Sequence, residues 1–113
     1  MIAIIGYLDV DPAVRDRLVE STAELQQATA RDEKGCLVYT MSADPARPGR
    51  ISIVELWDSP ESLAAHFQHP NFHATGAALR SEPRVGGSVM KYRIDAVAPV
   101  RGDDGVATAE FGS

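Results

Sequence analysis

The chain has 113 residues, of which 44% are hydrophobic and 24% are charged, and its formal net charge is -5. This composition is typical of one folded globular domain and excludes a disordered chain. The acidic balance argues against nucleic acid as a partner, because such binding draws its affinity from clustered Lys and Arg.

The hydropathy pattern and the N-terminal sequence bear on location. No apolar run reaches the roughly 20 residues that a membrane-spanning helix needs. The first ten residues, MIAIIGYLDV, alternate like a strand and lack a basic leader and a small-residue cleavage site. We therefore expect a cytoplasmic protein with no membrane partner.

The first part of the chain predicts a strand, a helix and a second strand. Residues 2–10 alternate, and Asp11 followed by Pro12 is typical of a helix start. Apolar residues then repeat at helical spacing as far as Gly35, which can adopt the left-handed conformation that ends helices. The next predicted strand spans residues 36–42.

The following segment predicts another strand and another helix. A turn rich in proline and glycine, residues 44–49, leads into a strand at 50–57. Ser59 can cap the next helix, and Pro60 suits its first position. Because proline lacks a backbone N–H and clashes with the preceding turn, Pro70 should break this helix.

The helix should break near His69 and restart through residues 71–81, and a fourth strand is predicted at 85–94. The resulting order, β-α-β-β-α-β, is that of the ferredoxin-like α+β fold, an antiparallel sheet with its helices on one face. We expect one domain over residues 1–100. The tail, residues 101–113, is small, polar and acidic, and should be mobile or pack on a partner.

The strands are apolar on both faces, which predicts a partner for the sheet. An uncovered sheet face is usually polar. Here Val54 points opposite to Ile53 in one strand, and Ile5 points opposite to Ile4 in another. Since the helices can cover one face only, we predict a homodimer in which two sheets pack together.

A carboxylate and a tryptophan share one face near the end of the 50–57 strand. Glu55 lies two residues before Trp57, so both side chains should point toward the helices. A buried carboxylate needs a partner or a functional reason. Two alternatives stay open: Trp57 fills the core or an interface, and Glu55 reaches water or pairs with Arg80 or Arg84.

Three histidines, His66, His69 and His73, fall in the helical region that follows. On an unbroken helix their spacing would suit metal ligands, but Pro70 interrupts it, and Cys36 is the only cysteine. We therefore expect no metal site. His66 borders the apolar stripe and should point toward the sheet or a cavity, and His69 should close a helix, where a partly positive imidazole suits the dipole.

The stretch from Glu55 to Phe72 resembles the antibiotic biosynthesis monooxygenase family. It contains E-x-W, then S-x-E-x-L-x-A-H, and then a phenylalanine, and the similarity extends over about residues 2–94, including KGCLVY at 34–39. The resemblance implies a quinol-monooxygenase-like protein with the fold of a dimeric α+β barrel. Its pocket would lie between the sheet and the helices.

The resemblance also implies an activity. Such proteins oxidise a small aromatic, quinol or polyketide-like substrate with dioxygen, and catalysis is thought to use no metal and no flavin, so we expect no cofactor. The deprotonated substrate is the electron-rich species that reacts with dioxygen. The protein then has to supply a base, donors that stabilise the anion, and a dry apolar wall.

Site roles follow from the resemblance. His66 is the leading acid/base candidate, and Glu55 is the second catalytic candidate. Trp57 would orient the substrate as a wall of the pocket. The expected substrate-binding residues are Trp57, Tyr39, Phe67, Asn71 and Phe72.

Two positions depart from the family pattern and keep other functions open. Ile53 replaces an asparagine of some oxygenating members, and Asn71 replaces a histidine of many relatives. Asn71 can form hydrogen bonds but cannot take up a proton at neutral pH. The alternatives are an isomerase or signal-degrading enzyme that moves protons through Glu55 and His66 without oxygen, and a non-catalytic ligand-binding dimer.

Overall fold

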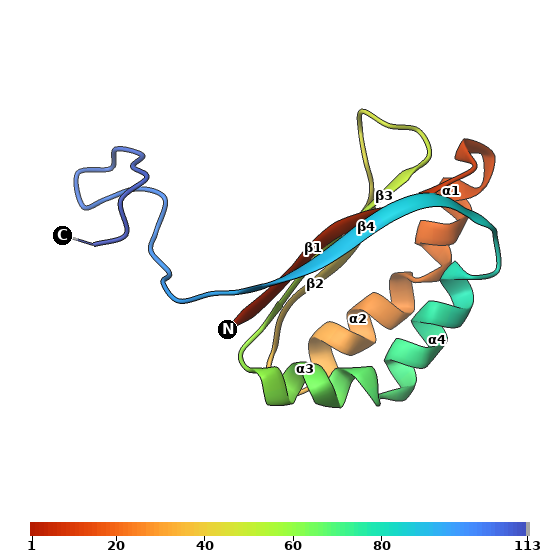
Figure 1. Ribbon diagram of the computed structural model, residues 1–113, viewed down its shortest axis with the longest axis horizontal. Coiled ribbons are helices and arrows are strands. Elements are labelled where there is room, and N and C mark those ends of the chain that lie inside the picture. The colour runs from red at the N-terminus through yellow and green to blue at the C-terminus, as the bar shows by residue number, and fades with distance from the viewer. Residues whose placement is uncertain (113) are drawn as a thin grey trace.

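The computed structural model describes residues 1–112 and has the predicted ferredoxin-like α+β fold. Its antiparallel sheet has the strand order β2-β3-β1-β4, and the helices lie on one face (Figure 1). The strands are β1 (Ile2–Val10), β2 (Cys36–Ala43), β3 (Arg50–Trp57) and β4 (Arg84–Arg93). The helices are α1 (Pro12–Ser21), α2 (Ala23–Asp32), α3 (Pro60–Phe67) and α4 (Pro70–Leu79).

The first predicted helix is in fact two helices that meet at Thr22. Asp11 caps α1 as expected, because its carboxylate accepts a hydrogen bond from the Ala13 N–H at 2.9 Å. At the junction, the buried Thr22 hydroxyl donates to the Val19 carbonyl at 2.8 Å. The prediction of one continuous helix as far as Gly35 was wrong, because this side-chain hydrogen bond competes with the helical backbone pattern.

Two contacts fix α2 against the sheet. The Gln26 amide donates to the Met41 carbonyl and accepts from the Met41 N–H, each at 3.0 Å, so it occupies backbone groups of the edge strand β2. Gly35 then turns the chain into β2 with a φ of 83°. A Cβ at this position would also collide with Ser62 in α3, so glycine is required on both counts.

The break between α3 and α4 is confirmed near His69. Ser59 caps α3, as predicted, by accepting a hydrogen bond from the Ser62 N–H at 3.1 Å. His69, however, begins α4: its Nδ1 accepts a hydrogen bond from the Asn71 N–H at 3.0 Å. The expectation that His69 closes a helix was wrong, because its side chain caps the first turn of α4 instead.

The two faces of the sheet differ in cover. The core lies between the sheet and the helices, where Trp57 and Ile51 are fully buried. On the opposite face Ile5, Val54 and Met90 lie side by side across three strands and are 51%, 44% and 57% exposed. The apolar character of both faces is therefore as the sequence predicts.

Residues 94–112 continue from β4 and extend away from the body of the protein (Figure 1). Within this segment Arg101 pairs with Ala107, and the side chains of Val97, Val100 and Phe111 are exposed. Ser113, the last residue of the predicted tail, lies outside the described residues. Across residues 1–112, no helix has the length and apolar character needed to cross a membrane.

Candidate active site

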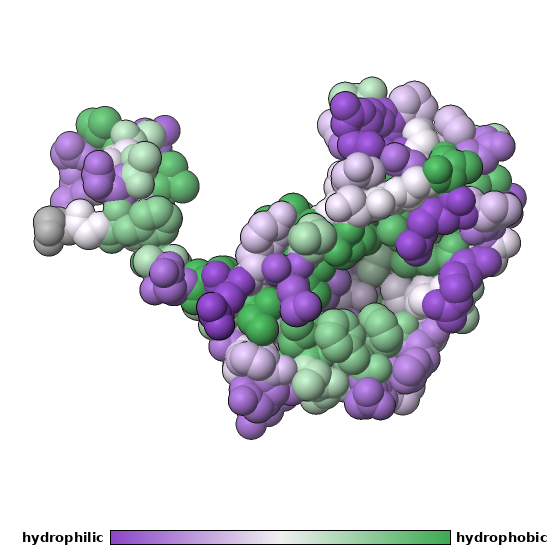
Figure 2. Space-filling model, in the orientation of Figure 1, coloured by the Kyte–Doolittle hydropathy of each residue, from purple (hydrophilic) through white to green (hydrophobic). Residues whose placement is uncertain are grey.

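An apolar cavity of about 500 Å³ lies on the helix-covered side of the sheet. The helices pack mainly over β2 and β3, so the space between α4 and β4 remains open. Figure 2 shows this hollow at the centre of the molecular face. Its floor and apolar sides include Ile4, Leu8, Met41, Ile53, Leu79 and Val89, and its polar lining comes from Tyr39, Glu55, Thr75, Arg80, Arg84 and Lys91.

Glu55 is the buried carboxylate on the cavity wall. It lies opposite Ile4 in β1, which in turn lies opposite Lys91 in β4, so these three side chains share the helix-covered face. The Trp57 indole N–H donates to Glu55 Oε1 at 3.0 Å. Burial raises the pKa of the Glu55 carboxyl, and the hydrogen bond from Trp57 only partly offsets that rise. The ionised form is therefore a stronger base than an exposed glutamate.

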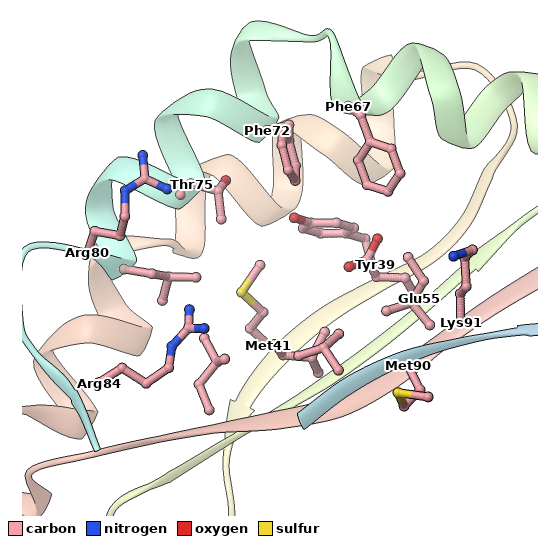
Figure 3. A pocket seen from close by; sticks show the side chains of 16 residues that line it. Tyr39, Met41, Glu55, Phe67, Phe72, Thr75, Arg80, Arg84, Met90 and Lys91 are labelled. Atoms are coloured by element: carbon pink, nitrogen blue, oxygen red, sulfur yellow. The ribbon is translucent and has the colours of Figure 1, made fainter. Parts of the chain in front are cut away.

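Two hydroxyl groups face the same space (Figure 3). Tyr39 lies opposite Glu55 in the β2–β3 register, and burial, together with the Glu55 charge, raises the pKa of its phenol well above the ordinary value. Tyr39 thus stays neutral and can donate a hydrogen bond. The Thr75 hydroxyl lies near that of Tyr39, but the two do not meet hydrogen-bond geometry, and Thr75 Oγ1 has no partner within residues 1–112.

Phe67 and Phe72 form an aromatic edge above the polar groups (Figure 3). Their ring centroids are 5.1 Å apart at an angle of 61°, and both rings are partly exposed. Aromatic rings in such edge-to-face contact offer an apolar surface suited to another planar ring. The cavity therefore combines a buried carboxylate, hydrogen-bond donors and an aromatic wall.

Trp57, His66 and Asn71 lie behind this cavity instead of on its wall. Trp57 is fully buried, and its ring centroid lies 4.6 Å from that of His66. His66 Nδ1 lies 2.7 Å from Glu33 Oε1, and the Asn71 amide donates to Glu33 Oε2 at 3.1 Å. Glu33 therefore binds two partners, His66 and Asn71, and the Trp57 ring packs against the His66 imidazole.

The other two histidines form no hydrogen bond with Glu33 among residues 1–112. His69 caps α4, with its Nδ1 3.7 Å from Glu33 Oε2, and His73 is exposed. Glu33, His66 and His69 border a second, polar depression of about 440 Å³ beside α3. No group of three His, Cys, Asp or Glu side chains within residues 1–112 is arranged to hold a metal ion.

The structure thus brings together part of the predicted site: Glu55, Tyr39, Phe67 and Phe72 line the cavity. Within residues 1–112 no ion pair joins Glu55 to Arg80 or Arg84, the partners considered from the sequence.

Sequence reasoning missed Glu33 and Thr75. The sequence did contain a signal for Glu33. It is a carboxylate two residues before Gly35, where the chain turns from the predicted helix toward the sheet, and a side chain at such a turn can point into the domain. Thr75 gave none, because a single threonine in an alanine-rich helix is unremarkable until the neighbouring strands are placed.

The fold and this cavity define the class, a small α+β domain with a ligand-sized apolar cavity beside a sheet. The chain belongs to the antibiotic biosynthesis monooxygenase family, whose sequence pattern matches residues 1–78. Comparison with curated proteins gave no significant match.

Solved structures agree with this assignment. A protein from Deinococcus radiodurans, provisionally described as an antibiotic biosynthesis monooxygenase, is 25% identical with a TM-score of 0.78, and the match covers 90% of this chain and all (100%) of that one. A protein from Caulobacter crescentus with the same provisional description is 27% identical with a TM-score of 0.74, and the match covers 86% of this chain and 90% of that one. The ferredoxin-like expectation is therefore confirmed.

Proposed function

We propose that the protein is a cofactor-independent monooxygenase that oxidises a small aromatic, quinol or polyketide-like substrate with dioxygen. The observation that carries the proposal is Glu55, a buried carboxylate of raised pKa on the wall of an apolar cavity. Membership of the antibiotic biosynthesis monooxygenase family supports the reaction class.

Proton transfer begins the proposed reaction. The Glu55 carboxylate accepts a proton from an acidic O–H or C–H group of the substrate, and the neutral Tyr39 phenol donates a hydrogen bond to the resulting oxyanion. The anion then transfers electrons to dioxygen. One oxygen atom enters the product and the other leaves as water, as when a ring CH₂ becomes a carbonyl group.

The cluster behind the cavity positions the base. The Trp57 N–H holds one oxygen of Glu55, and His66 packs against the Trp57 ring. Glu33 in turn fixes the His66 imidazole through Nδ1. We therefore assign proton abstraction to Glu55, and we assign His66, first expected to be the base, a positioning role, since its side chain is 1% exposed.

We also infer that a second copy of the chain covers the open sheet face. Ile5, Val54 and Met90 expose a continuous apolar surface there, and packing it against the same surface of another copy removes it from water. The exposed apolar residues of the tail, Val106 and Phe111, favour a tail that packs on the same partner.

The test is oxygen uptake by the purified protein, treated with a chelator, against a panel of reduced quinols and anthrones. Uptake that is saturable in substrate and well above autoxidation supports the proposal. A folded protein that binds these aromatics without consuming oxygen contradicts it and favours the isomerase or ligand-binding alternative.

A further inference from the structure

One end of the cavity carries positive charge that the proposed proton transfer does not use. Arg80 follows the last residue of α4, and Arg84 is the first residue of β4. Both side chains line the cavity at the end away from Glu55 (Figure 3). Within residues 1–112 neither guanidinium has an ion-pair partner.

The carboxylate nearest to them in sequence is already bound elsewhere. Glu82 lies between the two arginines in the connecting loop, and its Oε1 accepts a hydrogen bond from Arg17 in α1. The loop thereby holds its acid against α1 and leaves both cations without a counter-ion. In a chain of net charge -5, two unpaired arginines that line the same cavity create a local attraction for anions.

Gly76 makes room for one of these guanidinium groups. A Cβ built on Gly76 would lie 2.8 Å from Arg80 Nη1, so the guanidinium packs directly over the bare backbone of α4. Glycine destabilises the interior of a helix. At this position the bare backbone leaves room for the Arg80 guanidinium, which a larger side chain would push aside.

A second polar feature lies between the arginines and the base. Thr75 is 3% exposed and its hydroxyl has no hydrogen-bond partner within residues 1–112, although it lines the cavity. Figure 3 shows Thr75 between Arg80 and Tyr39. A buried hydroxyl without a partner is rare in folded proteins, and a ligand oxygen would satisfy this one.

We propose that Arg80 and Arg84 bind a carboxylate of the substrate, which is therefore a hydroxylated aromatic acid. The planar fork of each guanidinium suits a carboxylate. With the acid group at this end, the ring lies along the Phe72 side of the cavity and its hydroxyl reaches Glu55. The orientation rests on the proposed function, which places the reacting group at Glu55.

The test compares 6-hydroxy-2-naphthoate with 2-naphthol, which lacks the carboxylate, by isothermal titration calorimetry under nitrogen. We expect the acid to bind about tenfold more tightly or better, as charge-assisted hydrogen bonds allow. Arg80→Gln and Arg84→Gln should each weaken binding of the acid about tenfold and leave 2-naphthol unaffected. Arg47→Gln, which removes an equal charge in the β2–β3 loop, is the matched control and should change neither affinity.

Two further variants separate charge from geometry. Arg84→Lys keeps the charge but loses the fork, so its affinity for the acid should lie between those of wild type and Arg84→Gln. Gly76→Ala displaces the Arg80 guanidinium and should weaken binding of the acid more than that of 2-naphthol, although Gly76 also lines the cavity.

Equal affinity for the two compounds, including no binding of either, overturns the proposal, as does an equal loss in the Arg47→Gln control. Because oxygen is absent, this result is independent of turnover: a preference for the acid without oxygen uptake defeats the monooxygenase and leaves the carboxylate site standing.

Discussion

Glu33 and Glu55 are both buried carboxylates, but their surroundings differ. Both oxygens of Glu33 are engaged, one with His66 at 2.7 Å and the other with Asn71 at 3.1 Å. Glu55 accepts one hydrogen bond, from Trp57, and lines an apolar cavity. Burial alone does not mark a reactive group. A carboxylate with spare acceptor capacity toward a cavity is equipped for proton transfer, whereas one with both oxygens bound holds the fold together.

The largest expected effect is on turnover, which should depend on the carboxylate of Glu55. Glu55→Gln keeps the shape of the side chain but removes the base, so oxygen uptake should fall about 100-fold or more, the scale of general-base loss. Glu61→Gln, on the exposed surface of α3, is the control and should retain full turnover. Wild-type turnover in a folded Glu55→Gln protein would remove Glu55 from the mechanism.

The next effect concerns stability. Glu33→Ala leaves the buried His66 imidazole and the Asn71 amide without their acceptor, and should lower the free energy of unfolding by about 3 kcal/mol. Urea unfolding measures this, with the exposed Glu20→Ala as a control that should change little. An unchanged midpoint in Glu33→Ala would show that this cluster does not stabilise the fold.

A charge on the open sheet face tests the proposed dimer, which covers the face of the sheet opposite to both glutamates. Val54→Lys places an ammonium group in the proposed interface, and light scattering at micromolar concentration should shift from the mass of two chains toward that of one. Thr40→Lys, on the same face of the edge strand β2, shows how far the interface extends. A wild-type mass of one chain would contradict the dimer itself.

The smallest effect is the pH dependence of stability. Because burial raises the pKa of Glu55, the folded chain keeps a proton at pH values where the unfolded chain has lost it. The stability contributed by protonated Glu55 is complete below the unfolded pKa and is lost as the pH rises through the folded pKa. The Tm of Glu55→Gln should therefore gain on wild type as the pH rises through that window, and a parallel pair of Tm curves would contradict the raised pKa.

Much of the fold could be predicted from local signals. The strands at 2–10 and 50–57 and the helix start at Pro60 are where alternation and capping residues place them. The break at Thr22 could not be predicted in this way, because it depends on a threonine hydroxyl that binds a carbonyl one turn earlier, and no glycine or proline marks it.

The site was less predictable, because a cavity is made by residues that are distant in sequence. Glu55, Tyr39 and the phenylalanines follow from strand alternation, helix spacing and the family resemblance. His66 satisfies the same criteria, yet it lies behind the wall, because Glu33 at the end of α2 holds its imidazole. That contact joins residues 33 positions apart, and local periodicity carries no information about it.

The most direct test of the central claim is the absorption spectrum of anthrone mixed with the protein in the absence of oxygen. Deprotonation by the cavity base should produce the band of the anthrone enolate in wild type and in folded Glu33→Ala, and Glu55→Gln should show no band. An enolate band of full strength in Glu55→Gln, or one lost in folded Glu33→Ala but kept in Glu55→Gln, would contradict the assignment of Glu55 as the base.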